Sequence, residues 1–256
     1  MSEEKSNKTM NIHGHLSELR IRLIWSLLIF IICFGVCFYY SEEIYAFLVK
    51  PLAKIYENQS GKRLIYTGLT EAFVTYMKVA FYSGLFISFP FIAAQFYIFL
   101  APGLYKKEKK VLLPFLIATP VLFFAGGALV YYLIFPLAWE FFASFETLGG
   151  QGELPIMLEA KVSEYLSLVI NLILAFGIVF QMPILLTLLA KVGFITSDML
   201  AQNRRYAVVI ILLLAAFLTP PDIMSQIGLA IPMMLLYEIS IFSCRMVTKQ
   251  QEQIND

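Results

Sequence analysis

Charged residues are scarce in this sequence. They make up 14% of the 256 residues, whereas hydrophobic residues make up 59%. Soluble domains typically carry about 25% charged and roughly 45–50% apolar residues. The mean hydropathy of +0.76 points the same way. This composition excludes an ordinary soluble domain and predicts a protein that crosses the membrane several times.

Concentrated positive charge is also missing. The formal net charge is +1, and the chain has no basic arm and no run of positive charge longer than a few residues. Proteins that bind nucleic acid usually carry a basic patch or stripe that contacts phosphates. The charge pattern therefore predicts no nucleic-acid partner.

Histidine and cysteine are rare, which limits the chemistry that the chain can perform. Both histidines, His13 and His15, precede the first apolar run, so a buried serine–histidine pair has no candidate base. A membrane zinc protease would need paired histidines within a helix. The three cysteines predict no disulfide framework, and we expect Cys33 and Cys37 to be small apolar side chains on one helix face. We predict no catalytic residue, no metal ligand and no cofactor.

The N-terminal segment lacks the features of a cleavable signal peptide. It is polar and carries acids, with no short apolar core followed by a small-residue cleavage site. We expect the first apolar run to be retained as a helix.

Long apolar runs make up most of the remaining chain. A helix needs about 20 apolar residues to cross the hydrocarbon core. The tandem prolines in Thr219–Asp222 break the last apolar block into a hairpin, because proline lacks an N–H and disfavours helix at the preceding residue. We predict an all-α polytopic membrane protein, one domain over residues 1–256, with six transmembrane helices of which the final two are short. The predicted spans are residues 21–40, 73–100, 111–135, 162–189, 206–219 and 223–244.

Lysine and arginine are divided unequally between the two sides of these spans. Thirteen fall on the side that holds both termini and the loops after the second and fourth spans, and five fall on the other side. Cytoplasmic loops are enriched in these residues. We therefore predict that both termini are cytoplasmic, and that the two long loops, residues 42–71 and 140–161, lie on the outer side.

Two carboxylates stand among cations on the predicted cytoplasmic side. Glu18 lies in HLSELR, four residues before Arg22, and Glu108 is the one acid among four lysines in FLAPGLYKKEKK. Taken alone, the first is an ion pair on an interfacial helix, and the second balances the charge of its loop. Two such carboxylates can also receive a pair of guanidinium groups, because arginine presents a planar fork that matches carboxylate geometry.

Polar residues within apolar runs are expensive to bury and mark candidate sites. The simplest role for Gln181 is a hydrogen bond between helices, and the simplest role for Asp222 and Gln226 is a polar cap of the hairpin turn. A secondary transporter or channel would need a polar, often ionisable path through the midplane. The mid-span polar residues Gln95, Asn171 and Gln181 cannot ionise.

Five motifs occur in order along the chain: HLSELR, FLAPGLYKKEKK, YYLIFPLA, FGIVFQMP and LTPPDIMSQ. Together with six helices, they resemble TatC, the large multi-spanning subunit of the twin-arginine protein translocase, over about residues 11–246. The resemblance implies a multi-pass protein of the bacterial inner membrane, shaped like a cupped glove. It implies a signal-peptide receptor and core component of a machine that exports folded proteins with the proton-motive force, and no enzymatic activity. The alternative is a secondary transporter or channel.

The same resemblance implies roles for individual residues. Glu18 and Glu108 would bind the two arginines of a twin-arginine signal peptide. Gln181 would line the concave face, where many relatives carry a glutamate; a glutamine keeps the polarity but cannot ionise. Single-span subunits resembling TatA and TatB would dock along the fifth and sixth helices, in an oligomeric receptor complex surrounded by membrane lipid. The remaining implied residues are Arg20, Phe99, Pro102, Leu104 and Tyr105 for the signal peptide, Thr219, Asp222 and Gln226 for the partner helices, and Pro51 and Tyr131 for fold or activity.

Overall fold

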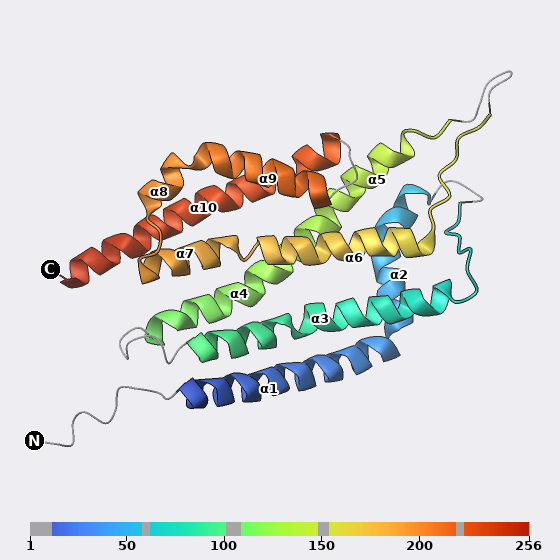
Figure 1. The fold of residues 1–256 in the computed structure, drawn as a ribbon. Helices are drawn as coiled ribbons and strands as arrows, with labels where there is room; N and C mark the ends of the chain where they lie inside the picture. The colour runs from blue at the N-terminus through green and yellow to red at the C-terminus, as the bar shows by residue number, and fades with distance from the viewer. Residues whose placement is uncertain (1–11, 58–61, 101–108, 148–153, 219–222, 256) are drawn as a thin grey trace, which may run out of the picture. The chain divides into compact units, whose positions relative to one another are not determined.

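The chain is helical almost throughout the part that the structure describes. A computed structural model describes residues 12–57, 62–100, 109–147, 154–218 and 223–255 (Figure 1). Within these ranges the only β-type pairings are two isolated bridges. The elements are α1 (Ile12–Tyr39), α2 (Ser41–Ile55), α3 (Glu71–Leu100), α4 (Lys109–Leu129), the π-helix η2 (Val130–Ile134), α5 (Phe135–Ala143), α6 (Val162–Val179), α7 (Met182–Val192), α8 (Ser197–Gln202), α9 (Arg204–Leu218) and α10 (Ile223–Asn255).

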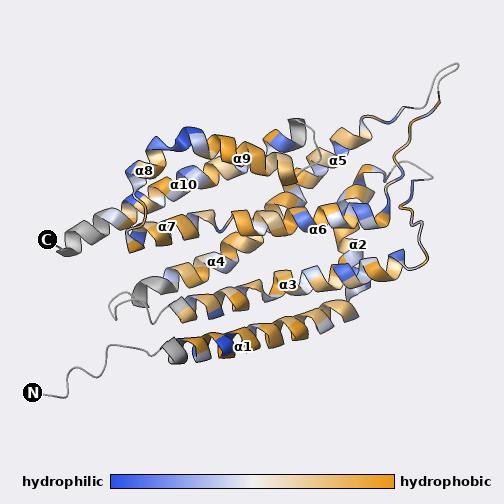
Figure 2. Ribbon diagram, viewed as in Figure 1, coloured by the Kyte–Doolittle hydropathy of each residue, from blue (hydrophilic) through white to orange (hydrophobic). Residues whose placement is uncertain are grey.

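Five helical segments of the described chain are long and apolar enough to cross a membrane. Apolar residues dominate along them (Figure 2), as expected for helices surrounded by lipid and by other helices. Helix α9 has 15 residues, which gives about 22 Å of helix against a hydrocarbon core of about 30 Å. The all-helical fold of a multi-spanning membrane protein is confirmed. The five segments are Leu16–Tyr39, Glu71–Phe99, Pro114–Ala143, Val162–Val192 and Gln226–Thr248.

Two helices continue beyond the ends that the sequence predicts. The third predicted span ends at residue 135, but the helix continues through η2 and α5 to Ala143. Pro136 does not end it, because the wider π-turn just before allows the Phe135 N–H to reach the Val130 carbonyl. The last helix continues past residue 244 to Asn255, since no glycine or proline follows Pro232 and its final residues favour helix.

The fourth predicted span is interrupted in its second half. Helix α6 ends at Val179 and α7 begins at Met182. Pro183 has no N–H to donate to the carbonyl four residues earlier, so the helical ladder cannot continue unbroken. The N–H of Gln181 instead donates to the Ile178 carbonyl at 2.9 Å. Gln181 therefore lies at the break in a 31-residue apolar segment.

The described helices form two compact units. One contains residues 1–41 and 77–120, and the other contains residues 42–76 and 121–256. The prediction of one domain over the whole chain stays a prediction, as do the cupped shape and the orientation of the termini.

In the first unit, α1 and α3 run antiparallel and approach closely. The Phe81 ring of α3 meets the Phe30 ring of α1 edge to face, with centroids 5.1 Å apart. At Gly84 an added Cβ would lie 2.8 Å from the Phe34 Cα, which is too close for any side chain. Glycine at this position therefore allows the contact that holds α1 against α3. Helix α4 joins α3 through a hydrogen bond from the Thr119 hydroxyl to the Tyr97 hydroxyl, at 3.0 Å.

In the second unit, α4 and α6 cross at two glycines. A Cβ on Gly126 would lie 2.6 Å from the Phe176 carbonyl oxygen, and one on Gly177 would lie 2.6 Å from the Phe123 ring. Small residues at such crossings are typical of membrane helices, because van der Waals packing drives their association. Helix α10 packs along α7 and α9, and the pair α9–α10 is visible as a hairpin in Figure 1.

Candidate functional site

A polar cluster near the start of the first apolar span joins α1 to α3. The Nε of Arg22 donates to Glu18 Oε1 at 3.0 Å, and its Nη2 donates to the same oxygen. The Nη1 of Arg22 donates to the Gln95 side-chain oxygen at 3.2 Å. The side chains of Arg22 and Glu18 are 19% and 21% exposed, so the pair is largely shielded but still reachable. The i,i+4 spacing predicts the ion pair; nothing local predicts its contact with Gln95, 73 residues away.

The two carboxylate oxygens of Glu18 have different surroundings. Oε1 accepts both hydrogen bonds from Arg22. Oε2 accepts no hydrogen bond from any residue that the structure describes. An ionised carboxylate can accept about four hydrogen bonds. Glu18 therefore has unused capacity to bind a second cationic donor.

The other residues predicted for the signal peptide are only partly described. Arg20 is exposed on α1. Phe99 follows Gln95 by four residues on α3, and this spacing places the two on one face of the helix. Three of the predicted site residues thus lie on the helix pair that carries the polar cluster. The remaining four, Pro102, Leu104, Tyr105 and Glu108, lie outside the described residues.

The predicted concave-face and partner-contact residues are separate from this cluster in the sequence. The Gln181 side-chain nitrogen lies 3.5 Å from the Gly177 carbonyl oxygen, one turn earlier in the chain. The Gln226 side-chain nitrogen donates to the Leu212 carbonyl of α9 at 3.1 Å, so Gln226 links the two helices of the last hairpin. Thr219 and Asp222 lie outside the described residues. The assignment of these residues to a concave face or to partner helices stays a prediction.

Pro51 and Tyr131 both affect the backbone carbonyl of Phe47. Pro51 lies inside α2 and has no N–H to donate to the Phe47 carbonyl. The Tyr131 hydroxyl donates to that carbonyl at 2.7 Å, and its ring stacks on the Phe47 ring at 4.4 Å. The next carbonyl, of Leu48, accepts from the Tyr165 hydroxyl at 2.9 Å. Tyr131 thus supplies the donor that Pro51 removes, and the roles of both residues in fold or activity stay a prediction.

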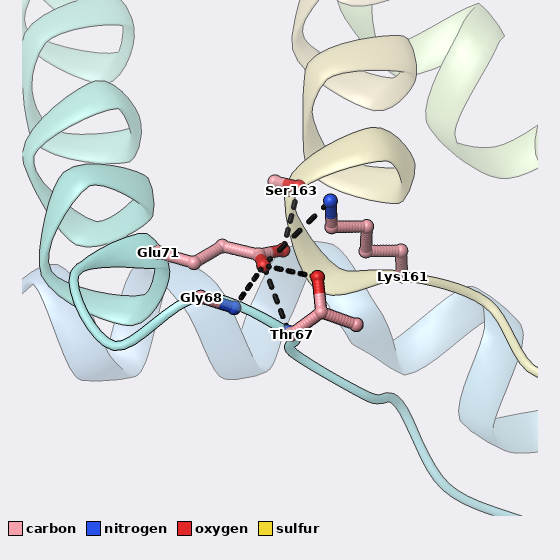
Figure 3. A network of polar contacts seen from close by, with 5 residues as sticks. All are labelled: Thr67, Gly68, Glu71, Lys161 and Ser163. Carbon is pink, nitrogen blue, oxygen red and sulfur yellow. Dashed lines mark hydrogen bonds and ion pairs between the residues drawn. The ribbon is translucent and has the colours of Figure 1, made fainter.

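A second polar network surrounds Glu71 at the start of α3 (Figure 3). Its Oε2 accepts from the backbone N–H groups of Thr67 and Gly68, at 2.9 and 3.2 Å. Its Oε1 accepts from the Ser163 hydroxyl at 2.6 Å, and Lys161 Nζ lies 3.8 Å from Oε2. The carboxylate therefore ties the turn before α3 to the start of α6. An acid in the first helical turn is visible in the sequence, but nothing local indicates its partner Ser163, 92 residues away.

A third network surrounds Glu146 in the loop after α5. Lys62 Nζ donates to its Oε1 at 2.5 Å, the Leu158 N–H donates at 3.0 Å and the Tyr56 hydroxyl at 3.1 Å. The hydrogen bond from Lys62, and then those from Leu158 and Tyr56, hold the pKa of the Glu146 carboxyl below its usual value of 4.5. Sequence reasoning missed this network, because Lys62 and Glu146 are 84 residues apart.

A backbone pairing joins the same two loops. The Ile65 N–H donates to the Ala160 carbonyl at 3.1 Å, and the Val162 N–H donates to the Ile65 carbonyl at 2.9 Å. With the Glu71 and Glu146 networks, this pairing fixes the loop before α3 against the loop before α6. In the described part of the chain, no group of three or more His, Cys, Asp or Glu side chains is arranged to hold a metal ion.

Comparisons with known proteins agree on one family. The family model described as "Sec-independent protein translocase protein (TatC)" matches residues 14–232. A protein of that name from Rickettsia prowazekii is 47% identical over 240 residues, covering 94% of each chain. One from Magnetococcus marinus is 47% identical over 93% of this chain and 85% of its own length. These matches cover nearly the full length of the chain and are not confined to a single motif.

A solved structure has the same fold. It is described as a crystal structure of the twin-arginine translocase receptor TatC, and it superposes with a TM-score of 0.76 at 37% identity, covering 91% of this chain and 99% of the other. Members of this family are components of the twin-arginine translocase. Their role is in transport and is not catalytic. The chain belongs to the TatC family of Sec-independent protein translocases.

Proposed function

We propose that this chain is the receptor for twin-arginine signal peptides within its translocase, and that Glu18 binds one of the two arginines. Glu108, on the loop between α3 and α4, is proposed to bind the other. Arg20, Phe99, Pro102, Leu104 and Tyr105 are proposed to shape the same surface. The description of the related crystal structure as a receptor supports this proposal.

The observation that carries the proposal is the unused hydrogen-bonding capacity of the Glu18 carboxylate. It is shielded enough to strengthen an electrostatic contact, and its Oε2 accepts nothing from the described residues. Two carboxylates attract a pair of guanidinium groups and repel an acidic peptide. Arginine binds a carboxylate through two parallel N–H bonds, which lysine cannot do. A receptor built on carboxylates would therefore distinguish arginine from lysine.

The wider proposal concerns topology, partners and energy. We place the protein in the bacterial inner membrane with both termini in the cytoplasm, as the lysine and arginine distribution predicts. Single-span subunits resembling TatA and TatB are proposed to dock along α9 and α10. Gln226 joins these two helices and, with Thr219 and Asp222, is proposed to form the contact. The proton-motive force is proposed to drive export, since the sequence has no phosphate-binding loop for nucleotide hydrolysis.

The test is binding of a fluorescein-labelled twin-arginine signal peptide to the purified protein in lipid nanodiscs. We expect Glu18→Gln to weaken binding at least tenfold, because it removes the charge and leaves the shape of the side chain. Glu43→Gln is the matched control, since Glu43 is exposed on α2 and has no role in the proposed site. Equal affinities for Glu18→Gln and the wild type would refute the assignment of Glu18.

A further inference from the structure

Arg22 occupies the carboxylate that the proposed function assigns to the incoming peptide. We propose that Arg22 is a built-in competitor for Glu18, which holds the carboxylate in the empty receptor and is displaced by a signal-peptide arginine. This inference rests on the proposed function, because both concern the same side chain. It assigns to Arg22 a role in setting the affinity of the receptor.

The bonding pattern explains why displacement is required. Two N–H groups of Arg22 both point at Glu18 Oε1, which leaves Oε2 for the first contact with a new guanidinium. Fork-to-fork pairing uses both carboxylate oxygens. A peptide arginine therefore reaches its full set of bonds only when Arg22 leaves Oε1, and two guanidinium groups on one carboxylate also repel each other.

Gln95 gives the displaced arginine a place to remain. Its side-chain oxygen accepts from Arg22 Nη1 at 3.2 Å, and it lies on α3, not on the helix that carries Glu18. Arg22 can therefore release Oε1 while keeping its hydrogen bond to α3. A shielded cation without any partner is costly, and this retained bond lowers the cost of opening the site.

A competitor of this kind has a defined thermodynamic signature. It reduces the apparent affinity of a ligand that needs both oxygens of Glu18 by a factor set by the fraction of receptors whose carboxylate is free. A lysine ammonium, which can bind Oε2 alone, is affected less, so removing the competitor increases the preference for arginine over lysine. For an i,i+4 ion pair at this exposure, we expect a factor of about three.

The experiment compares Arg22→Gln with the wild type, using labelled twin-arginine and twin-lysine peptides in nanodiscs. We expect the twin-arginine peptide to bind about threefold more tightly to Arg22→Gln, and the twin-lysine peptide to gain less. Arg245→Gln is the control for loss of one positive charge, because Arg245 is exposed on α10, and it should leave both affinities unchanged. Arg22→Lys should lie between Arg22→Gln and the wild type, since an ammonium makes a weaker contact with the carboxylate.

Weaker or unchanged binding of the twin-arginine peptide to Arg22→Gln, or a gain for the twin-lysine peptide alone, would overturn the competitor role. If Arg22→Gln does not fold, Arg22→Lys, which retains the charge, tests the same competitor role through a smaller gain in affinity. Glu18→Gln separates the two proposals. Unchanged binding to that variant removes the proposed function and this inference together, whereas loss of binding there with weaker binding to Arg22→Gln removes only the inference.

Discussion

Glu18 and Glu71 are both shielded carboxylates, but the chain uses them differently. Glu71 has both oxygens engaged, by two backbone N–H groups, two hydroxyls and a lysine. Glu18 has one oxygen engaged by Arg22 alone, and the other accepts nothing from the described residues. A carboxylate that its own chain satisfies completely stabilises the fold. One that keeps an open oxygen is suited to bind a ligand.

The largest loss of stability is expected from Glu71→Ala. The change leaves the N–H groups of Thr67 and Gly68 and the hydroxyl of Ser163 without their acceptor, and unpaired polar groups are costly. We expect a lower thermal midpoint, measured with a thiol-reactive dye that reports exposure of the buried Cys37 and Cys244. Glu164→Ala, at an exposed site in the first turn of α6, is the control. Equal midpoints for the two variants would contradict a structural role for Glu71.

The next largest effect is expected from Tyr131→Phe. It removes the only side-chain donor found for the Phe47 carbonyl among the described residues, and we expect a loss of about 1–3 kcal/mol in the free energy of unfolding. Titration of the micelle-bound protein with sodium dodecyl sulfate measures it. Tyr132→Phe is the control, because the Tyr132 side chain is exposed.

Pro51→Ala sharpens this prediction. Alanine restores the N–H that the Phe47 carbonyl lacks, so Tyr131→Phe should cost less in the Pro51→Ala background than in the wild type. The difference between the two costs is the coupling energy of a double-mutant cycle. Identical costs in both backgrounds would mean that proline and tyrosine act independently.

A smaller effect is expected from protonation of Glu146. Its folded pKa is lowered, chiefly by the hydrogen bond from Lys62, so the carboxylate stabilises the fold at pH values above about 4.5 and loses this contribution as the pH falls further. The thermal midpoint of the wild type should decrease as the pH is lowered below about 4.5. Glu146→Gln should start lower at pH 7 and show a shallower decline. Parallel pH profiles would show that another group causes the acid sensitivity.

The smallest effect is expected from Gln95→Ala. It removes one hydrogen bond between α1 and α3, and such contacts between membrane helices are worth about 0.6 kcal/mol on average. Titration with sodium dodecyl sulfate measures the loss. A loss as large as that of Tyr131→Phe would mean that the cluster at Glu18 is primarily structural, which would weaken the comparison with Glu71.

The sequence predicts the helices well because length and apolarity alone decide what crosses a membrane. It also predicts the short α9, since the tandem prolines after Leu218 limit its length. It does not predict the continuation to Ala143, because the effect of Pro136 depends on the π-turn before it. It places Gln181 inside a continuous span, whereas the residue lies at the break between α6 and α7.

The polar sites divide according to the sequence separation of their partners. The pair Glu18–Arg22 is visible in the sequence because the spacing of four residues places both on one helix face. The contacts of Arg22 with Gln95, of Lys62 with Glu146 and of Ser163 with Glu71 span 73 to 92 residues. Tertiary packing alone brings these side chains together. For that reason the roles proposed for Arg22 and Glu71 follow from the structure and not from the motifs.

The most direct measurement is the ratio of the dissociation constants of twin-lysine and twin-arginine peptides, for the wild type and for Glu18→Gln in nanodiscs. If the open oxygen of Glu18 recognises a guanidinium, the ratio is well above one for the wild type and falls markedly towards one for Glu18→Gln. If the ratio is the same for both proteins, Glu18 does not distinguish arginine from lysine, and the proposal that this carboxylate binds a signal-peptide arginine is wrong.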